Sequence, residues 1–339
     1  MPPLDKIRQL TSKVGIYQHG ALDQPTPVFG YALEDQARAL IIAHEFGTKD
    51  LEEIYLNFII RARSKNVFLN QYYYEDERGF SEDITPLTVL DRQEAYGITL
   101  WALFSTNNFQ NEKIKPLINQ LLTNAHLWVS PRAIATALLG LSYLPTQSPL
   151  EKELAEKTYQ FYKQVATEDW QWFENYLTYA NAILPWACWE VALSRKDQGM
   201  EKTADITTKF LINTCQIKGI PMSIGNRGWY KKEGEKILFD QQPIDAAYMV
   251  CCLEKAYLTT KNQFYLNWAK KWWGWFWSNN INRISLIDKN YGCYDGLTKE
   301  GVNLNQGAES NICFLMAYLA AKRMGLLAVA KQIVLSAAP

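Results

Sequence analysis

The sequence lacks a surplus of charge of either sign, a long apolar run and more than a few histidines. Its 35 Lys and Arg balance 35 Asp and Glu over 339 residues, which argues against a nucleic-acid partner, because such binding depends on excess cationic side chains. No run of about 18 apolar residues is present, so no membrane span is expected. The first residues, Met1–Lys6, do not resemble a secretory signal, and we expect a soluble, cytoplasmic protein.

Metal and cofactor motifs are also missing. The six cysteines are scattered without CxxC spacing, which predicts neither a disulfide framework nor a zinc site. Phosphate-binding loops of the GxGxxG or GxxxxGKS type are absent. We therefore expect no metal and no cofactor. The histidines are His19, His44 and His126.

Apolar residues recur instead with the 3.6-residue period of helices. One set of segments is rich in Ala and Leu throughout, as expected for helices covered on most sides: 31–45, 89–105, 131–144, 175–194, 242–258 and 306–323. A second, more amphipathic set lies between them: 49–64, 111–126, 149–166, 200–215, 262–278 and 326–337.

Equivalent helices return at intervals of roughly 40 to 65 residues, which is typical of stacked or closed helical repeats. Six such pairs predict an all-α fold, an (α/α)6 toroid forming a single domain over residues 1–339. An open solenoid would need polar capping repeats at its ends, and the apolar last helix does not supply one.

Three connections are long: 65–88, 216–241 and 279–305. Compact domains rarely keep loops of this length unless they are functional. Residues 67–80 and 228–239 read as aromatic β-hairpins. In a toroid all three loops fall on the face where the inner helices begin, so we expect a cleft there.

Acidic residues gather at those helix starts. Capping and the helix dipole explain any single one of them. Several carboxylates around one cavity, however, would perturb one another and suit catalysis. Paired carboxylates amid aromatic side chains fit glycoside cleavage, in which one acid protonates the leaving oxygen and the other activates water or attacks the sugar. The candidates are Asp240 or Glu309 as general acid, with Asp35 or Glu94 as the opposing base.

Four segments carry a resemblance to a known family: YALEDQARALI, WFENYLTYANAILP, GWYKKEGEKILFDQQPIDAA and GCYDGLTKEGVNLNQGAES. In this order, they resemble the bacterial helical-barrel domain found alone or fused behind a family 4 type glycosyltransferase, a relative of the six-hairpin glycosidases. The resemblance implies an (α/α)6 fold and an oligosaccharide or glycoconjugate as ligand, with a glycosyltransferase as a possible partner.

The residues carried over from this resemblance, or chosen for their stacking and hydrogen-bonding side chains, form the expected sugar-binding set. They are Arg38, Trp172, Glu174, Tyr179, Asn181, Trp229, Gln241, Gln242, Tyr294, Asn305 and Gln306. The chain departs from the family pattern at Ile98, Ala180 and Asp245, where relatives often carry Arg, an acid and Glu. Such departures point to an altered substrate or a weakened site.

Two alternatives to hydrolysis stay open. A non-catalytic glycan-binding or scaffold domain would need the aromatic cleft but no acid pair, and Ala180 agrees with it. A sugar epimerase would share the toroid, but that chemistry usually relies on histidine bases on inner helices. His44 is expected at the far end of the first inner helix, which makes the epimerase the weaker alternative.

Overall fold

The computed structural model describes residues 4–64, 68–81 and 88–328, and it divides into two compact units. The amino-terminal unit spans Ile7–Thr158, and the carboxy-terminal unit joins residues 4–6 to the chain from Tyr159 onward. Each unit is described by itself. The single domain that the sequence predicts stays a prediction.

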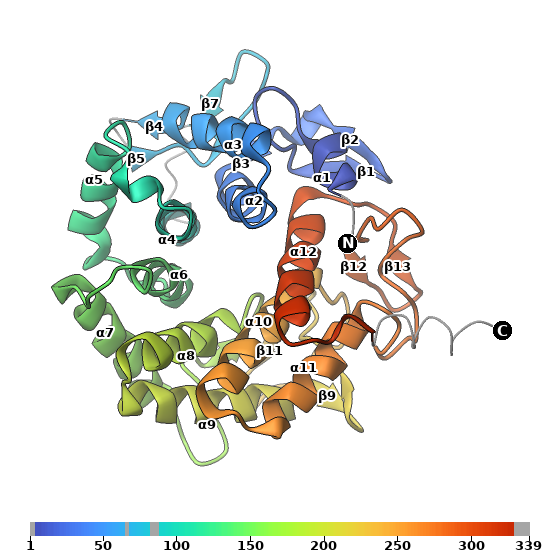
Figure 1. Ribbon diagram of the computed structural model, residues 1–339. Coiled ribbons are helices and arrows are strands. Elements are labelled where there is room, and N and C mark those ends of the chain that lie inside the picture. Colours follow the sequence, from blue (N-terminus) through green and yellow to red (C-terminus); the bar gives the residue numbers. More distant parts are fainter. Residues whose placement is uncertain (1–3, 65–67, 82–87, 329–339) are drawn as a thin grey trace. The chain divides into compact units, whose positions relative to one another are not determined.

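Three helices form the centre of the amino-terminal unit: α2 (Leu33–Glu45), α4 (Thr88–Ser105) and α6 (Pro131–Leu141). Helix α4 packs between α2 and α6 (Figure 1). Behind them, α3 (Lys49–Arg61) lies on α2, and α5 (Lys115–Ala125) contacts α4. Two further helices reach the edges of this unit, α1 (Asp5–Leu10) and α7 (Pro149–Val165).

Two glycines allow α4 and α6 to approach closely. A Cβ atom on Gly97 would lie 2.4 Å from the Ala133 carbonyl oxygen, and one on Gly140 would lie 2.9 Å from Trp101 Cα. Both distances are too short for any side chain. Because position 97 meets 133 and position 140 meets 101, the two helices run parallel, and their amino ends lie at the same end of the unit.

The carboxy-terminal unit repeats this arrangement with α8 (Ile183–Arg195), α10 (Pro243–Thr260) and α12 (Ala308–Arg323) side by side. Helix α9 (Gln198–Thr214) covers α8, and α11 (Gln263–Trp275) covers α10 (Figure 1). The Trp186 ring packs edge-on against Tyr248, and Arg323 forms a two-point ion pair with the buried Glu254. The three central helices are again parallel.

The helices agree with the sequence prediction except at one place. The expected helix over 175–194 begins only at Ile183, because Asn181 folds the preceding segment into a turn. Its Oδ1 accepts from the Thr178 amide at 3.0 Å, its Nδ2 donates to the Thr178 carbonyl at 2.7 Å, and Ala180 has a φ of 50°. Most of the predicted helix over 326–337 lies outside the described residues.

Strands are short and occur in the connections. They are β1 (His19–Ala21), β2 (Gln24–Thr26), β3 (Tyr31–Ala32), β4 (Arg63–Ser64), β5 (Phe68–Leu69), β6 (Tyr72–Tyr73), β7 (Phe80–Ser81), β8 (Tyr176–Leu177), β9 (Gln216–Ile217), β10 (Ile220–Pro221), β11 (Tyr230–Lys231), β12 (Gly296–Leu297) and β13 (Val302–Asn303). All pairings are antiparallel, and β3, β6 and β7 form one three-stranded sheet.

One predicted hairpin is wrong. Residues 228–239 do not pair with each other; Tyr230 and Lys231 instead pair with Leu177 and Tyr176 from the loop before α8. The second half of this segment is used differently, since the Ile237 carbonyl accepts from the Gly225 amide at 2.7 Å. In the other hairpin region, β6 and β7 do pair, and β6 also joins β3.

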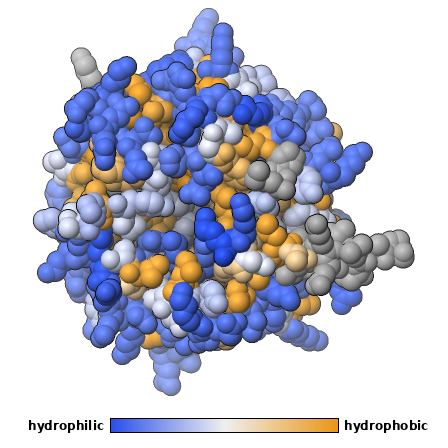
Figure 2. All heavy atoms as spheres, in the orientation of Figure 1, coloured by the Kyte–Doolittle hydropathy of each residue, from blue (hydrophilic) through white to orange (hydrophobic). Residues whose placement is uncertain are grey.

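The core of the carboxy-terminal unit is aromatic and holds all the cysteines. Trp189, Trp272, Trp273 and Trp275 are fully buried. The six cysteines are all buried and unpaired, and burial raises the pKa of the Cys252 thiol to about 12. On the face that Figure 2 shows, hydrophilic side chains alternate with apolar ones. No helix in the described part of the chain is long and apolar enough to cross a membrane.

Candidate functional site

The start of α2 carries the first group of predicted site residues. Asp35 and Arg38 are nearly inaccessible and form an ion pair one helical turn apart, with 3.1 Å between Asp35 Oδ1 and Arg38 Nη1. The Asp35 carboxylate is thus neutralised within its own helix. This contact favours a supporting role for Asp35 over the base that the sequence suggests.

The neighbouring acid, Glu34, has the more unusual environment. Its Oε1 accepts from the Gln71 side-chain amide at 2.7 Å, while Oε2 is shielded and has no hydrogen-bond partner among the described residues. Burial, with a smaller contribution from the nearby Glu94 charge, raises the pKa of Glu34 to about 7, although Arg38 and Gln71 act in the opposite direction. A glutamate that holds its proton near neutral pH can act as a general acid.

Glu94 approaches this group from the beginning of α4. Its Oε1 accepts from the Ser130 hydroxyl at 2.9 Å, and the Ser130 oxygen in turn caps α6 by accepting from the Ala133 amide. The adjacent Gln93 accepts from the amides of Val129 and Ser130. Gln93 and Glu94 therefore link α4 to the start of α6. The bond to Ser130 keeps the Glu94 carboxylate at the same end of the unit as Glu34.

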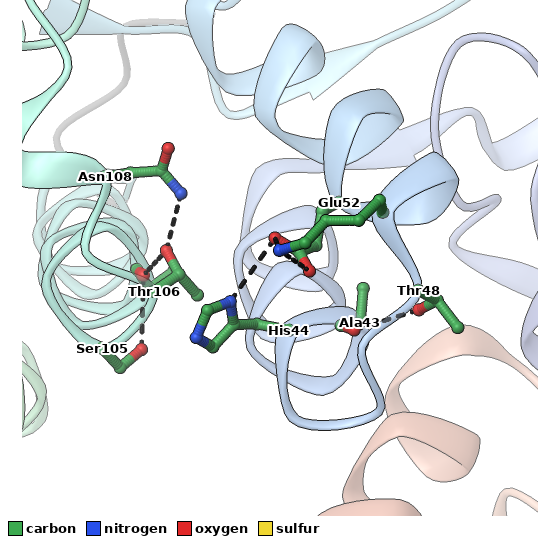
Figure 3. Close-up of polar contacts among 9 residues, drawn as sticks. Ala43, His44, Thr48, Glu52, Ser105, Thr106 and Asn108 are labelled. Atoms are coloured by element: carbon green, nitrogen blue, oxygen red, sulfur yellow. Dashed lines mark hydrogen bonds and ion pairs between the residues drawn. The ribbon is translucent and has the colours of Figure 1, made fainter.

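The histidines are elsewhere. Figure 3 shows His44 at the carboxyl end of α2, with its Nδ1 3.4 Å from Glu52 of α3. Lys49 also binds that carboxylate, at 3.0 Å. His19 lies on β1 against Phe29, and His126 ends α5. The sequence correctly places His44 at the far end of α2, away from Glu34.

In the carboxy-terminal unit, Asp240 lies in the loop before α10. Its Oδ2 accepts from Arg227 Nε at 2.6 Å, and its backbone oxygen accepts from the Asn226 amide. The Arg227 side chain is largely exposed, whereas only 23% of the Asp240 side chain is exposed. Elsewhere in the same unit, the partly exposed rings of Trp229 and Tyr179 pack against each other with their centres 6.0 Å apart. Flat aromatic faces of this kind can stack on sugar rings.

Several predicted sugar contacts face inward instead. Trp172 is fully buried between Phe173 and Phe210. Gln241 is also fully buried, with its oxygen bound by Ser223 and Trp275 and its nitrogen by the Leu238 carbonyl. The Gln241 amide is therefore occupied inside the protein, whereas the buried Trp172 Nε1 has no hydrogen-bond partner among the described residues.

The Asn181 side-chain amide is also occupied inside the protein, since its oxygen and its nitrogen both bind the Thr178 backbone and close the turn there. Glu174 is 8% exposed, and its backbone oxygen accepts from Trp170 Nε1. Gln242 precedes α10 as its N-cap residue without a side-chain capping bond.

The start of α12 is organised by a residue that the sequence did not single out. Asp295 Oδ1 accepts from the amide of the N-cap residue Gly307 and from the Ser310 hydroxyl, both at 2.7 Å, and so fastens a preceding loop to the start of the helix. Glu309 lies in the first turn and is partly exposed. Gln306 is buried and donates to Asp288 at 2.8 Å, with its oxygen packed against Gly292.

Tyr294 and Asn305 border the same loop and are partly exposed. The backbone oxygen of Asn305 accepts from the Asp295 amide at 2.8 Å.

The structure thus groups the predicted acids by unit. Asp35 and Glu94 lie at the helix starts of the amino-terminal unit, and Asp240 and Glu309 at those of the carboxy-terminal unit. Glu34 is not among the predicted site residues, because at this helix start the family resemblance points to Asp35 and Arg38. Among the described residues, no group of three or more His, Cys, Asp or Glu side chains is arranged to hold a metal ion.

No protein-family model matches the chain, and a search of curated proteins found no match either. Solved structures do match. A D-mannose isomerase is 13% identical, with a TM-score of 0.68 over 94% of this chain and 95% of that one. Cellobiose 2-epimerase from Bacillus thermoamylovorans is 12% identical, with a TM-score of 0.69 over 93% and 95%.

An unsaturated glucuronyl hydrolase specific for heparin is 12% identical, with a TM-score of 0.58 over 96% and 95%. At this level of identity the likeness establishes the fold. It confirms the predicted all-α, (α/α)6 fold class.

Proposed function

We propose that the protein is a glycoside hydrolase that acts on an oligosaccharide or sugar conjugate, with Glu34 as its general acid. The observation that carries this proposal is the shielded Glu34 carboxyl, whose pKa is raised to about 7 beside Glu94. Glycoside cleavage needs one carboxyl group that is protonated and a second that is ionised. Fold likeness to carbohydrate-processing enzymes supports the same reading.

In this scheme Glu34 gives its proton to the glycosidic oxygen as the bond from that oxygen to the anomeric carbon breaks. Water supplies the new hydroxyl group, and Glu94 takes the second role as base. Asp35 supports the site through Arg38. Taken by itself, the carboxy-terminal unit offers the partly exposed pair Tyr179 and Trp229 as a surface that could contact a sugar. The pairing of Asp240 or Glu309 with these acids stays a prediction.

Release of reducing ends from a panel of oligosaccharides and glycoconjugates tests the proposal. Loss of a general acid typically costs about 100-fold to 10,000-fold in rate. The rate of reducing-end release by Glu34→Gln should therefore fall at least about 100-fold. The exposed Glu53 of α3 provides a matched control, and Glu53→Gln should retain full activity. If the wild type binds glycans and releases nothing, the protein is instead the glycan-binding or scaffold domain, and a glycosyltransferase partner becomes the next proposal to test.

The matched isomerase and epimerase structures favour one second candidate, sugar isomerisation or epimerisation. A carboxyl group with a pKa near 7 can also act as a base that removes a proton next to a carbonyl. Incubation of reducing sugars in heavy water separates the two functions. Deuterium at carbon 2 of the recovered sugar would support the isomerase or epimerase, and reducing-end release without deuterium would support the hydrolase.

A further inference from the structure

The loop that carries Gln71 is fastened to the beginning of α2 by backbone contacts. Ala32 pairs with Tyr72 where β3 meets β6, and the first amide of α2, at Leu33, donates to the Gln71 carbonyl at 2.8 Å. Gln71 itself is 7% exposed. Its backbone and side chain therefore both bind the first residues of α2, and its amide group is held in one place.

The two oxygens of Glu34 are not equivalent as a result. Gln71 Nε2 donates to Oε1 at 2.7 Å, whereas Oε2 is shielded and has no partner among the described residues. An amide N–H can only donate, so Oε1 must present a lone pair to it. In a protonated carboxyl group the carbonyl oxygen is the better acceptor, which leaves the hydroxyl on the other oxygen.

We propose that Gln71 is a positioning residue that keeps the Glu34 proton on Oε2, the oxygen that then delivers it to a bound substrate. This inference rests on the proposed function for the delivery step, although the placement of the proton does not require any substrate. A buried polar atom without a partner is rare in folded proteins. Because Oε2 is shielded, a ligand oxygen can complete its contacts only after the groups that cover Oε2 have moved.

The proton leaves Oε2 for the glycosidic oxygen, the bond from that oxygen to the anomeric carbon breaks, and Glu34 is left as a carboxylate. The Gln71 N–H bond to Oε1 strengthens when this charge appears. Arg38, whose positive charge already lowers the pKa of Glu34, stabilises the same carboxylate. Removal of the Gln71 donor should therefore raise the pKa of Glu34 further.

Infrared difference spectra recorded against pH test this inference without substrate. The carbonyl band of protonated Glu34 is identified by its loss in Glu34→Gln. In Gln71→Met the band should move to higher frequency, because its oxygen loses a donor, and its titration midpoint should rise by roughly 1 pH unit. If Gln71→Met does not fold, Gln71→Leu, which also lacks the amide donor and adds no charge, should raise the midpoint as well.

Asn70 gives a matched control from the same loop. It is 5% exposed, and its side-chain amide donates to the Ala62 carbonyl at 3.2 Å and not to Glu34. Asn70→Leu should leave both the band and its midpoint unchanged. An unmoved band in both Gln71 variants, or an equal movement in Asn70→Leu, overturns the inference. A shifted band in a protein that processes no glycan supports the proton placement and overturns the proposed function.

Discussion

Glu34 should make the stability of the protein depend on pH in a way that one substitution removes. Its ordinary pKa of 4.5 applies to the unfolded chain, and burial raises the pKa to about 7 in the folded protein. Below pH 4.5 both states are protonated, and the group costs nothing. As the pH rises from 4.5 to 7, the unfolded chain ionises first, so the folded state binds more protons and loses stability.

The difference between 4.5 and about 7 corresponds to about 3 kcal/mol of unfolding free energy, at about 1.36 kcal/mol for each pH unit. Glu34→Gln keeps an acceptor for Gln71 and removes the titrating proton. This variant should match the wild type near pH 4 and should be more stable by about 3 kcal/mol at pH 8.

Urea denaturation followed by tryptophan fluorescence, repeated from pH 4 to pH 8, measures this difference. Glu53→Gln, on the exposed side of α3, is the control and should follow the wild type at every pH. The reasoning about Glu34 is refuted if the stability difference between wild type and Glu34→Gln is the same at both ends of the range.

Three further substitutions test the contact between α4 and α6, the buried ion pair between α10 and α12, and the hydrogen bonds at the start of α12. Gly97→Val should cost at least about 1 to 3 kcal/mol, because a Cβ there meets the Ala133 carbonyl at 2.4 Å, and a lower thermal midpoint would show it. Arg323→Ala leaves the buried Glu254 carboxylate unpaired and should cost about 3 kcal/mol in chemical denaturation, with partial recovery in Arg323→Lys. Asp295→Ala removes two hydrogen bonds at the start of α12 and should cost about 1 to 3 kcal/mol, so faster exchange of the Gly307 amide is expected, and unchanged exchange would refute this role.

The helices were predictable because their signal is local. The apolar period of 3.6 residues located α2, α4, α6, α10 and α12 to within a few residues. It failed over 175–182, where apolar and aromatic residues continue the pattern but the Asn181 side chain competes for the Thr178 backbone. Side-chain competition of this kind depends on geometry that composition does not encode.

The strand partners and the important acid were not predictable for a different reason. Tyr230 pairs with Leu177, more than 50 residues away, and local alternation cannot identify such a partner. Glu34 and Asp35 are adjacent and equally acidic in the sequence. Their carboxylates differ in the partners that bind them. Gln71 binds Glu34 from a loop 37 residues later, and Arg38 pairs with Asp35.

All six thiols belong to one half of the molecule. Every cysteine lies after residue 187, within the carboxy-terminal unit, and every one is buried. Alkylating reagents can reach these sulfurs only when that unit opens, while opening of the amino-terminal unit leaves no chemical trace. The rate of thiol labelling in native buffer therefore reports the opening rate of the carboxy-terminal unit alone. Comparison of this rate with the rate of global unfolding would reveal whether the two units unfold in a single event.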